Sequence, residues 1–166
     1  MLVPFDALSK KSKVWIYQAN RELTESEVAK VVLELEQFLK NWQSHGKDLI
    51  ASYKIPYNQF IVLAIDEEKS KSSGCSVDAS VAVLRALEKD LQIDLFDRMK
   101  VTFKNEEHIN TVNLSDFKRF ANEGKITKNT IVFNNLVKNI AEFNTNWEIP
   151  AKDSWHDKFI ARKINS

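Results

Sequence analysis

The sequence predicts an α+β protein whose larger part, about residues 12–104, is a ferredoxin-like βαββαβ core. Four segments have the β-branched and apolar composition of strands, and two amphipathic helical segments separate the first from the second and the third from the fourth. This order is the split βαβ arrangement. The predicted strands 14–19 and 60–65 are apolar almost throughout, as expected of the two central strands, whereas 99–104 alternates apolar residues with lysines.

The first helix has the clearest local signals. Thr24 and Glu27 have the spacing of a capping box, and Leu23 and Val28 occupy the positions of a hydrophobic staple. Gly46 is expected to end this helix of about five turns in a left-handed conformation. Apolar residues at helical spacing form its predicted buried face: Val28, Val31, Val32, Leu35, Phe38, Leu39 and Trp42.

The remaining core elements follow in order. Residues 49–55 read as a strand, 60–65 as a second strand after a turn, and 66–73 as a polar loop. A second helix is predicted after Ser76, capped by that serine. Its predicted buried stripe is Val77, Val81, Leu84, Leu87 and Leu91.

Residues 105–166 are predicted to form a C-terminal α/β extension that packs on the core, so that 1–166 is a single domain. A short helix is expected with Asn113 or Ser115 as its N-cap, Phe117 and Phe120 on its face, and Gly124 near its end. Residues 130–133 read as a strand. Two tryptophans in the tail, Trp147 and Trp155, are expected to bury against the domain or a neighbouring chain.

Composition excludes several classes of function. The formal net charge is +1, which argues against a dedicated duplex-DNA binder. The longest apolar run, 60–65, is far too short to cross a membrane, and the N-terminal residues lack a signal-peptide pattern. A single cysteine, Cys75, cannot form an internal disulfide. These features predict a soluble cytoplasmic protein without a membrane partner.

No cofactor or metal is predicted. The three glycines lie too far apart for either of the glycine-rich loops that bind phosphates. The three histidines are also mutually distant, and no second cysteine is present to complete a structural zinc site.

The candidate pocket lies at the start of the second helix, in the segment Gly74, Cys75, Ser76, Val77 and Asp78. A helix N-terminus presents unpaired N–H groups and partial positive charge, which favour a thiolate or a small anionic ligand. The segment could therefore hold a thiol nucleophile or an anion. In the alternative interpretation, Ser76 caps the helix, Asp78 complements its dipole, and Cys75 is a small buried apolar residue.

His156 is the remaining candidate residue of that pocket. It lies between Asp153 and Asp157 in the tail, where it could transfer protons or approach Cys75 through the fold. Alternatively, Ser154 begins a final helical turn, Trp155 fills the core and His156 faces water.

Trp15 and Tyr17 alternate along the first strand and therefore project from one face. Strand aromatics of this kind stack bases in ferredoxin-like domains that bind RNA. The strand 60–65 lacks the glycine and basic residue of that signature, so nucleic-acid binding is disfavoured and burial of both rings is the alternative.

Three segments, Gly74–Asp78, Val14–Tyr17 and Trp147–Trp155, together resemble an uncharacterised family of short bacterial cytoplasmic proteins often labelled "ABC transporter ATPase". The resemblance implies a stand-alone bacterial cytoplasmic protein and carries no catalytic residues. The label conflicts with the residues, because such an ATPase needs a glycine-rich phosphate loop with a lysine. The sequence therefore predicts a protein that is not an ATPase.

Three functional hypotheses follow. The first is a non-enzymatic domain that binds a ligand or partner, assembled as a homo-oligomer because an open sheet face must be covered. The second is a thiol-dependent enzyme or redox sensor centred on Cys75. The third is single-stranded nucleic-acid binding through Trp15 and Tyr17.

Overall fold

The computed structural model describes residues 1–160 and is a mixed α+β structure with antiparallel sheets. Its internal contacts divide it into two compact units. The first unit comprises Met1–Phe96 and Lys138–Phe143, and the second comprises Asp97–Val137 together with the described residues from Asn144 onward. The expected single-domain organisation, with 105–166 packed on the core, stays a prediction.

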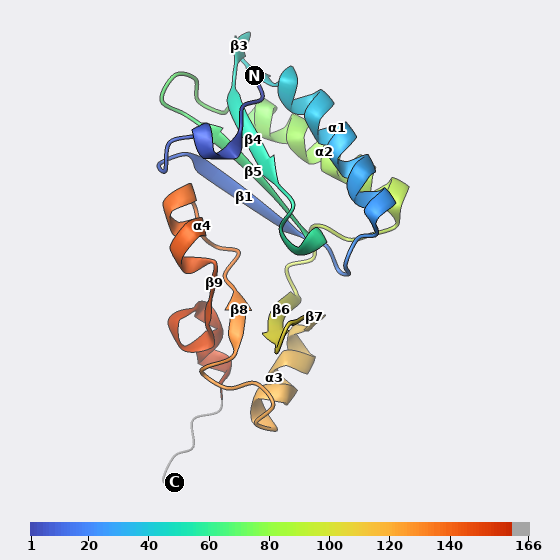
Figure 1. Cartoon of the computed structure of the whole chain (residues 1–166), viewed down its shortest axis with the longest axis vertical. Helices are drawn as coiled ribbons and strands as arrows, with labels where there is room; N and C mark the ends of the chain where they lie inside the picture. Colours follow the sequence, from blue (N-terminus) through green and yellow to red (C-terminus); the bar gives the residue numbers. More distant parts are fainter. Residues whose placement is uncertain (161–166) are drawn as a thin grey trace. The chain divides into compact units, whose positions relative to one another are not determined.

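The first unit follows the predicted order strand, helix, strand, strand, helix (Figure 1). Two short 3₁₀ helices, η1 (Phe5–Ala7) and η2 (Pro56–Asn58), accompany these elements. The five main elements are β1 (Lys13–Gln18), α1 (Glu25–Lys40), β4 (Ile50–Lys54), β5 (Phe60–Asp66) and α2 (Gly74–Leu91).

β5 is the middle strand of a sheet in the order β1-β5-β4, and it pairs antiparallel with both neighbours. Helices α1 and α2 lie along one face of this sheet, over Ile61, Leu63 and Ile65 (Figure 1). Phe60 and Val62 face the other side and are also fully buried. The prediction of a central strand at 60–65 is confirmed, and this sheet has no open apolar face along β5.

The predicted four-stranded ferredoxin-like sheet is not confirmed. The strand expected at 99–104 is β6 (Lys100–Asn105), and its hydrogen bonds lie in the sheet of the second unit. The outer edge of β1 instead meets residues 138–141, where Val14 N donates to Lys138 O and Ile140 N donates to Ser12 O, each over 3.0 Å. An antiparallel bridge between Lys13 and Asn139 completes this contact.

Helix α1 begins as the sequence predicts. The Thr24 hydroxyl accepts from Glu27 N, and the Glu27 carboxylate accepts from Thr24 N, so the capping box is confirmed. Its inward face carries Val31, Leu35 and Leu39, all fully buried.

The predicted end of α1 at Gly46 is wrong. The helix stops at Lys40, and Gly46 lies in the turn between the two-residue strands β2 (Gln43–Ser44) and β3 (Lys47–Asp48). Its φ of +78° is compatible with a tight turn and with a helix end, so a glycine at this position did not indicate which of the two is present.

Helix α2 begins earlier than predicted, and its buried face differs from the predicted one. Its N-cap is Ser73, and Ser76 is the third residue of the capping box. The inward positions are Ser76, Ser80, Leu84 and Leu87, instead of a stripe beginning with Val77 and Val81. Serines are tolerated there because each hydroxyl donates to a backbone carbonyl, Ser76 to Ser73 O and Ser80 to Val77 O.

The second unit contains a four-stranded antiparallel sheet in the order β7 (His108–Asn113), β6, β8 (Ile131–Phe133) and β9 (Glu148–Pro150). Helix α3 (Leu114–Asn122) has the predicted Asn113 as its N-cap residue, and Gly124 follows the helix with φ +77°. Helix α4 (Ile140–Asn146) belongs to the first unit as far as Phe143. Two 3₁₀ helices, η3 (Ala151–Asp153) and η4 (Trp155–Phe159), follow β9.

The tail packs within the second unit. β9 pairs with β8, and the Trp147 ring contacts Phe133 with centroids 4.8 Å apart. The Trp147 indole N–H donates to Asn135 Oδ1 over 2.8 Å. This tryptophan is therefore buried with its polar atom satisfied, as the sequence predicts for an aromatic tail.

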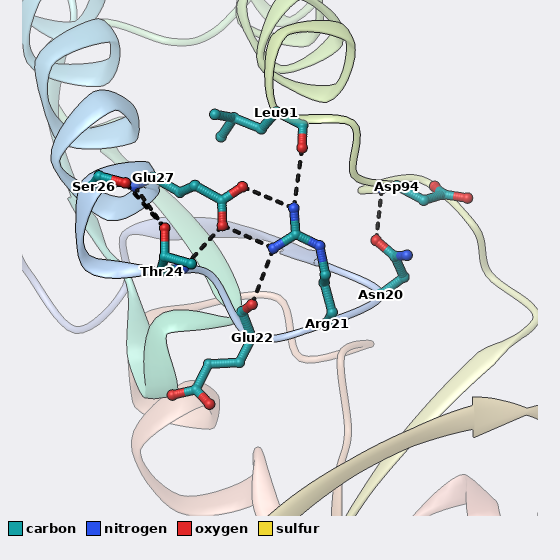
Figure 2. A network of polar contacts seen from close by, with 8 residues as sticks. All are labelled: Asn20, Arg21, Glu22, Thr24, Ser26, Glu27, Leu91 and Asp94. Atoms are coloured by element: carbon teal, nitrogen blue, oxygen red, sulfur yellow. Dashed lines mark hydrogen bonds and ion pairs between the residues drawn. The ribbon is translucent and has the colours of Figure 1, made fainter.

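Arg21 joins the start of α1 to the end of α2 (Figure 2). Its guanidinium donates to both Glu27 carboxylate oxygens over 2.8 Å and to Leu91 O over 3.1 Å. Glu27 thus serves the capping box of one helix, while Arg21 satisfies a carbonyl at the C-terminus of the other. Nearby, Asn20 Oδ1 accepts from Asp94 N over 2.8 Å, which ties the same loop to the segment after α2.

The Arg21–Glu27 pair predicts acid-dependent loss of stability. Hydrogen bonds from Arg21, and then from Thr24 N, lower the pKa of Glu27 from 4.5 to about 2. Because the folded pKa is the lower one, the stabilisation is complete above about pH 4.5 and is lost as pH falls toward 2. Urea unfolding of Glu27→Gln should therefore show a weaker decline below pH 4.5 than the wild type shows.

Glu25→Gln is the matched control, since Glu25 is an exposed acid in the same first turn. Equal pH dependence in the two variants would contradict this role for Glu27.

Candidate functional site

The candidate segment Gly74–Asp78 forms the first turn of α2. Cys75 is exposed, as are Gly74 and Asp78, whereas Ser76 is buried. Two details of the structural alternative are thus wrong: Cys75 is not a buried apolar residue, and Ser76 is not the cap. The thiol is accessible because the helix turns Ser76 toward the core and Cys75, one position earlier, toward solvent.

The surroundings of this turn are rich in acceptors. The capping box uses Ser76 N as a donor to Ser73 Oγ and Ser73 N as a donor to Ser76 Oγ. In the preceding loop the Glu67 carboxylate accepts from both the N–H and the hydroxyl of Ser72, over 2.7 and 2.9 Å. With Asp78 exposed in the same turn, two carboxylates accompany the site where an anion was expected, which weakens the electrostatic case for that ligand.

His156 lies in the second unit and is 1% exposed. Its Nδ1 is 2.7 Å from Ser154 Oγ, and its ring stacks on Trp155 with centroids 3.7 Å apart. Phe117 contacts the same imidazole, with centroids 5.6 Å apart. The expected roles are therefore exchanged: His156 is buried in the core, and Trp155 is half-buried.

Cys75 belongs to the first unit and His156 to the second, and each has its own local environment. In the first, an exposed thiol lies at a helix start. In the second, burial lowers the pKa of His156 to about 4, so the imidazole is neutral at physiological pH. A neutral, enclosed imidazole is suited to packing, since proton transfer requires access to a reacting group.

Trp15 and Tyr17 project from one face of β1, as predicted, and pack against the cluster beneath α1 and α2. The Tyr17 ring contacts Phe96 with centroids 5.3 Å apart. Burial raises the pKa of Tyr17, and a hydrogen bond with Ser80 partly offsets that rise. Both rings are half-buried, so base stacking on them stays a prediction that their packing does not favour.

A surface groove lies between α1 and α2 and opens to solvent. It measures about 280 Å³. Leu87 is buried and Val83 half-buried, whereas Ala82 and Ala86 are exposed. The complete lining is Glu34 of α1 with Ala82, Val83, Ala86, Leu87 and Asp90 of α2.

This groove was not predicted from the sequence. A signal existed, because the solvent face of α2 carries alanine at 79, 82 and 86, where the exposed face of a helix normally carries long polar residues. Alanine exposes the helix surface and leaves room for a neighbouring side chain.

Charges of both signs border the groove. Lys30 Nζ is 3.4 Å from Asp90 Oδ2 across the two helices. Glu34 contributes a second carboxylate to the lining. One helical turn from Lys30 on the outer side of α1, Leu33 is 56% exposed.

The lining determines what the groove can do. It contains alkyl groups and two carboxylates, and none of its residues is a cysteine, serine, histidine or lysine that could act as a nucleophile. Within residues 1–160, the His, Cys, Asp and Glu side chains form no group of three or more that could hold a metal ion. The groove's alkyl groups and carboxylates suit contact with an apolar group beside a cation.

Comparisons with known proteins assign no function: no family model, curated protein or solved structure matches the chain. Among the described residues, no helix combines the length and apolar character that crossing a bilayer requires.

Burial of His156 predicts that the second unit loses stability in mild acid. The pKa falls from 6.5 to about 4 on folding, so the unfolded chain binds the proton more tightly. The full contribution is present above about pH 6.5, and about 3 kcal/mol is lost by pH 4. His156→Leu should reduce this loss, measured as the difference in unfolding free energy between pH 7.5 and pH 4.

His108→Gln is the control, because His108 is an exposed histidine in β7 of the same unit. The assignment fails if His156→Leu retains the full wild-type difference between the two pH values.

Proposed function

We propose that this protein acts by binding a macromolecular partner, and that the solvent face of α1 and α2 is its contact surface. The single observation that carries this proposal is the groove of about 280 Å³ whose alanine side leaves the surface of α2 accessible. Helix-in-groove recognition uses surfaces of this kind, with one apolar side chain of the partner entering a depression between helices.

The electrostatics support a partner of defined chemistry. Glu34 lines the groove, and so does Asp90, which is paired with Lys30, so a helix that presents a leucine beside a basic residue would match its shape and its charge. Arg21 also bridges the ends of the two helices, through the Glu27 carboxylate and Leu91 O. A preformed surface loses little conformational entropy on binding.

Binding can be tested with a synthetic amphipathic helical peptide of leucine and lysine. In ¹H–¹⁵N spectra of the labelled full chain, titration should shift the amides of Ala82, Ala86 and Glu34. Ala86→Arg should abolish these shifts, because the new side chain fills the groove and repels a basic peptide. Helix propensity favours arginine, so the variant should fold.

Asn122→Arg is the control. It adds the same side chain to an exposed residue of α3, in the second unit, that does not line the groove. The proposal fails if the peptide leaves the groove amides unshifted, or if the two arginine variants respond alike.

A second candidate function rests on the exposure of Cys75 in the first turn of α2. The partial positive charge of a helix start favours a thiolate, as a redox sensor would need. The native chain should then be alkylated by iodoacetamide faster than the same chain unfolded in urea at the same pH. An equal or slower rate in the native chain rejects the thiol function.

We also propose that the first unit has a ferredoxin-like topology in which residues 138–141 replace 99–104 beside β1. Residues 138–141 meet the outer edge of β1 in antiparallel orientation, which is where that topology places its fourth strand. The bacterial source, the cytoplasmic location, the family resemblance and the small anionic ligand stay predictions.

A further inference from the structure

This inference rests on the proposed function. From the groove and Leu33, we infer that the partner seated on the α1–α2 face is a second copy of this chain. Leu33 of each copy enters the Ala82–Ala86 groove of the other, forming an isologous dimer. In such a dimer the same patch supplies both the projecting side chain and the depression that receives it.

The first support is complementarity of shape. Leu33 is 56% exposed on the outer side of α1, so it projects from the face that also bears the groove. The groove is bordered by Ala82 and Ala86, whose methyl groups leave space for a branched alkyl side chain. Insertion would remove both the exposed leucine and the exposed apolar lining from water.

The second support is complementarity of charge. Lys30 and Leu33 are three residues apart on α1, so they lie on the same side of that helix. A copy that inserts Leu33 therefore brings Lys30 toward the carboxylates of the other groove, Glu34 and Asp90. Within one copy Lys30 already pairs with Asp90 over 3.4 Å, so in the dimer its new contact is with the Glu34 carboxylate of the other copy.

The third support is the size of the face. α1 has 16 residues and α2 has 18, which gives lengths of roughly 24 and 27 Å. Two packed helices present a face roughly 20 Å wide, so each copy would bury roughly 500 Å², and the pair roughly 1,000 Å². This area is at the lower limit for a specific interface and predicts a weak, concentration-dependent dimer.

Sedimentation equilibrium of the full chain at roughly 10–500 µM tests the inference, with a monomer–dimer equilibrium expected in this range. Leu33→Glu should raise the dissociation constant roughly a hundredfold or more, because two leucines lose their burial. Leu136→Glu is the matched control, since Leu136 is 68% exposed in the second unit and should leave the equilibrium unchanged. Far-UV circular dichroism establishes that each variant is folded.

A complementation experiment tests the specific contact. Leu33→Ala lacks the projecting side chain but keeps the groove, and Ala86→Arg keeps the side chain but blocks the groove. Each variant alone should be monomeric, whereas an equimolar mixture should associate more weakly than the wild type, because one of the two contacts is restored. A weight-average mass that is no higher in the mixture than in either variant alone, at the highest concentration measured, would overturn the contact.

A wild-type chain that is monomeric up to roughly 500 µM overturns the inference. The proposed function is then judged separately by titrating Leu33→Glu with the leucine–lysine peptide. Chemical shift changes confined to the groove would support the proposed binding face and reject a second copy as its partner.

Discussion

Burial of β5 on both faces is the constraint on which the rest of the first unit depends. A strand with no polar side to expose must have neighbours on both edges and layers on both faces. The helices α1 and α2 supply one layer, and their inward residues are fixed by that contact. Because α1 and α2 both pack on one face of the sheet, the sides of the two helices that point away from the sheet are exposed to solvent.

The Arg21–Glu27 pair joins the two helices of that surface at one end. It connects the first turn of α1 to the last carbonyl of α2, which lacks a helical partner (Figure 2). At the other end, the Trp42 indole N–H donates to Ser76 O in the first turn of α2 over 2.9 Å. The groove therefore lies between helices that are bridged at both ends.

The candidate site was predicted only in part. The sequence correctly indicated that Cys75 lies at a helix start, because serines and a glycine mark that boundary locally. It could not indicate that Ser76 is buried and Cys75 exposed, because adjacent helical residues point about 100° apart and only packing decides which of them faces the core. His156 likewise sits in the core because Ser154, Trp155 and Phe117 converge on it, and Phe117 is remote in the sequence.

The sequence by itself determined the elements and their local ends: the capping box at Thr24, the central character of 60–65 and the helix that begins after Asn113. The first arises from side chain-to-backbone bonds between near neighbours, the second from a continuous apolar run, and the third from cap-type residues that precede the helix. The tertiary structure alone decided which strands share a sheet. Strand 99–104 and residues 138–141 both could have met the edge of β1, since backbone hydrogen bonds carry no sequence signature. Long-range packing selected 138–141, and the same packing left alanines on the outer face of α2.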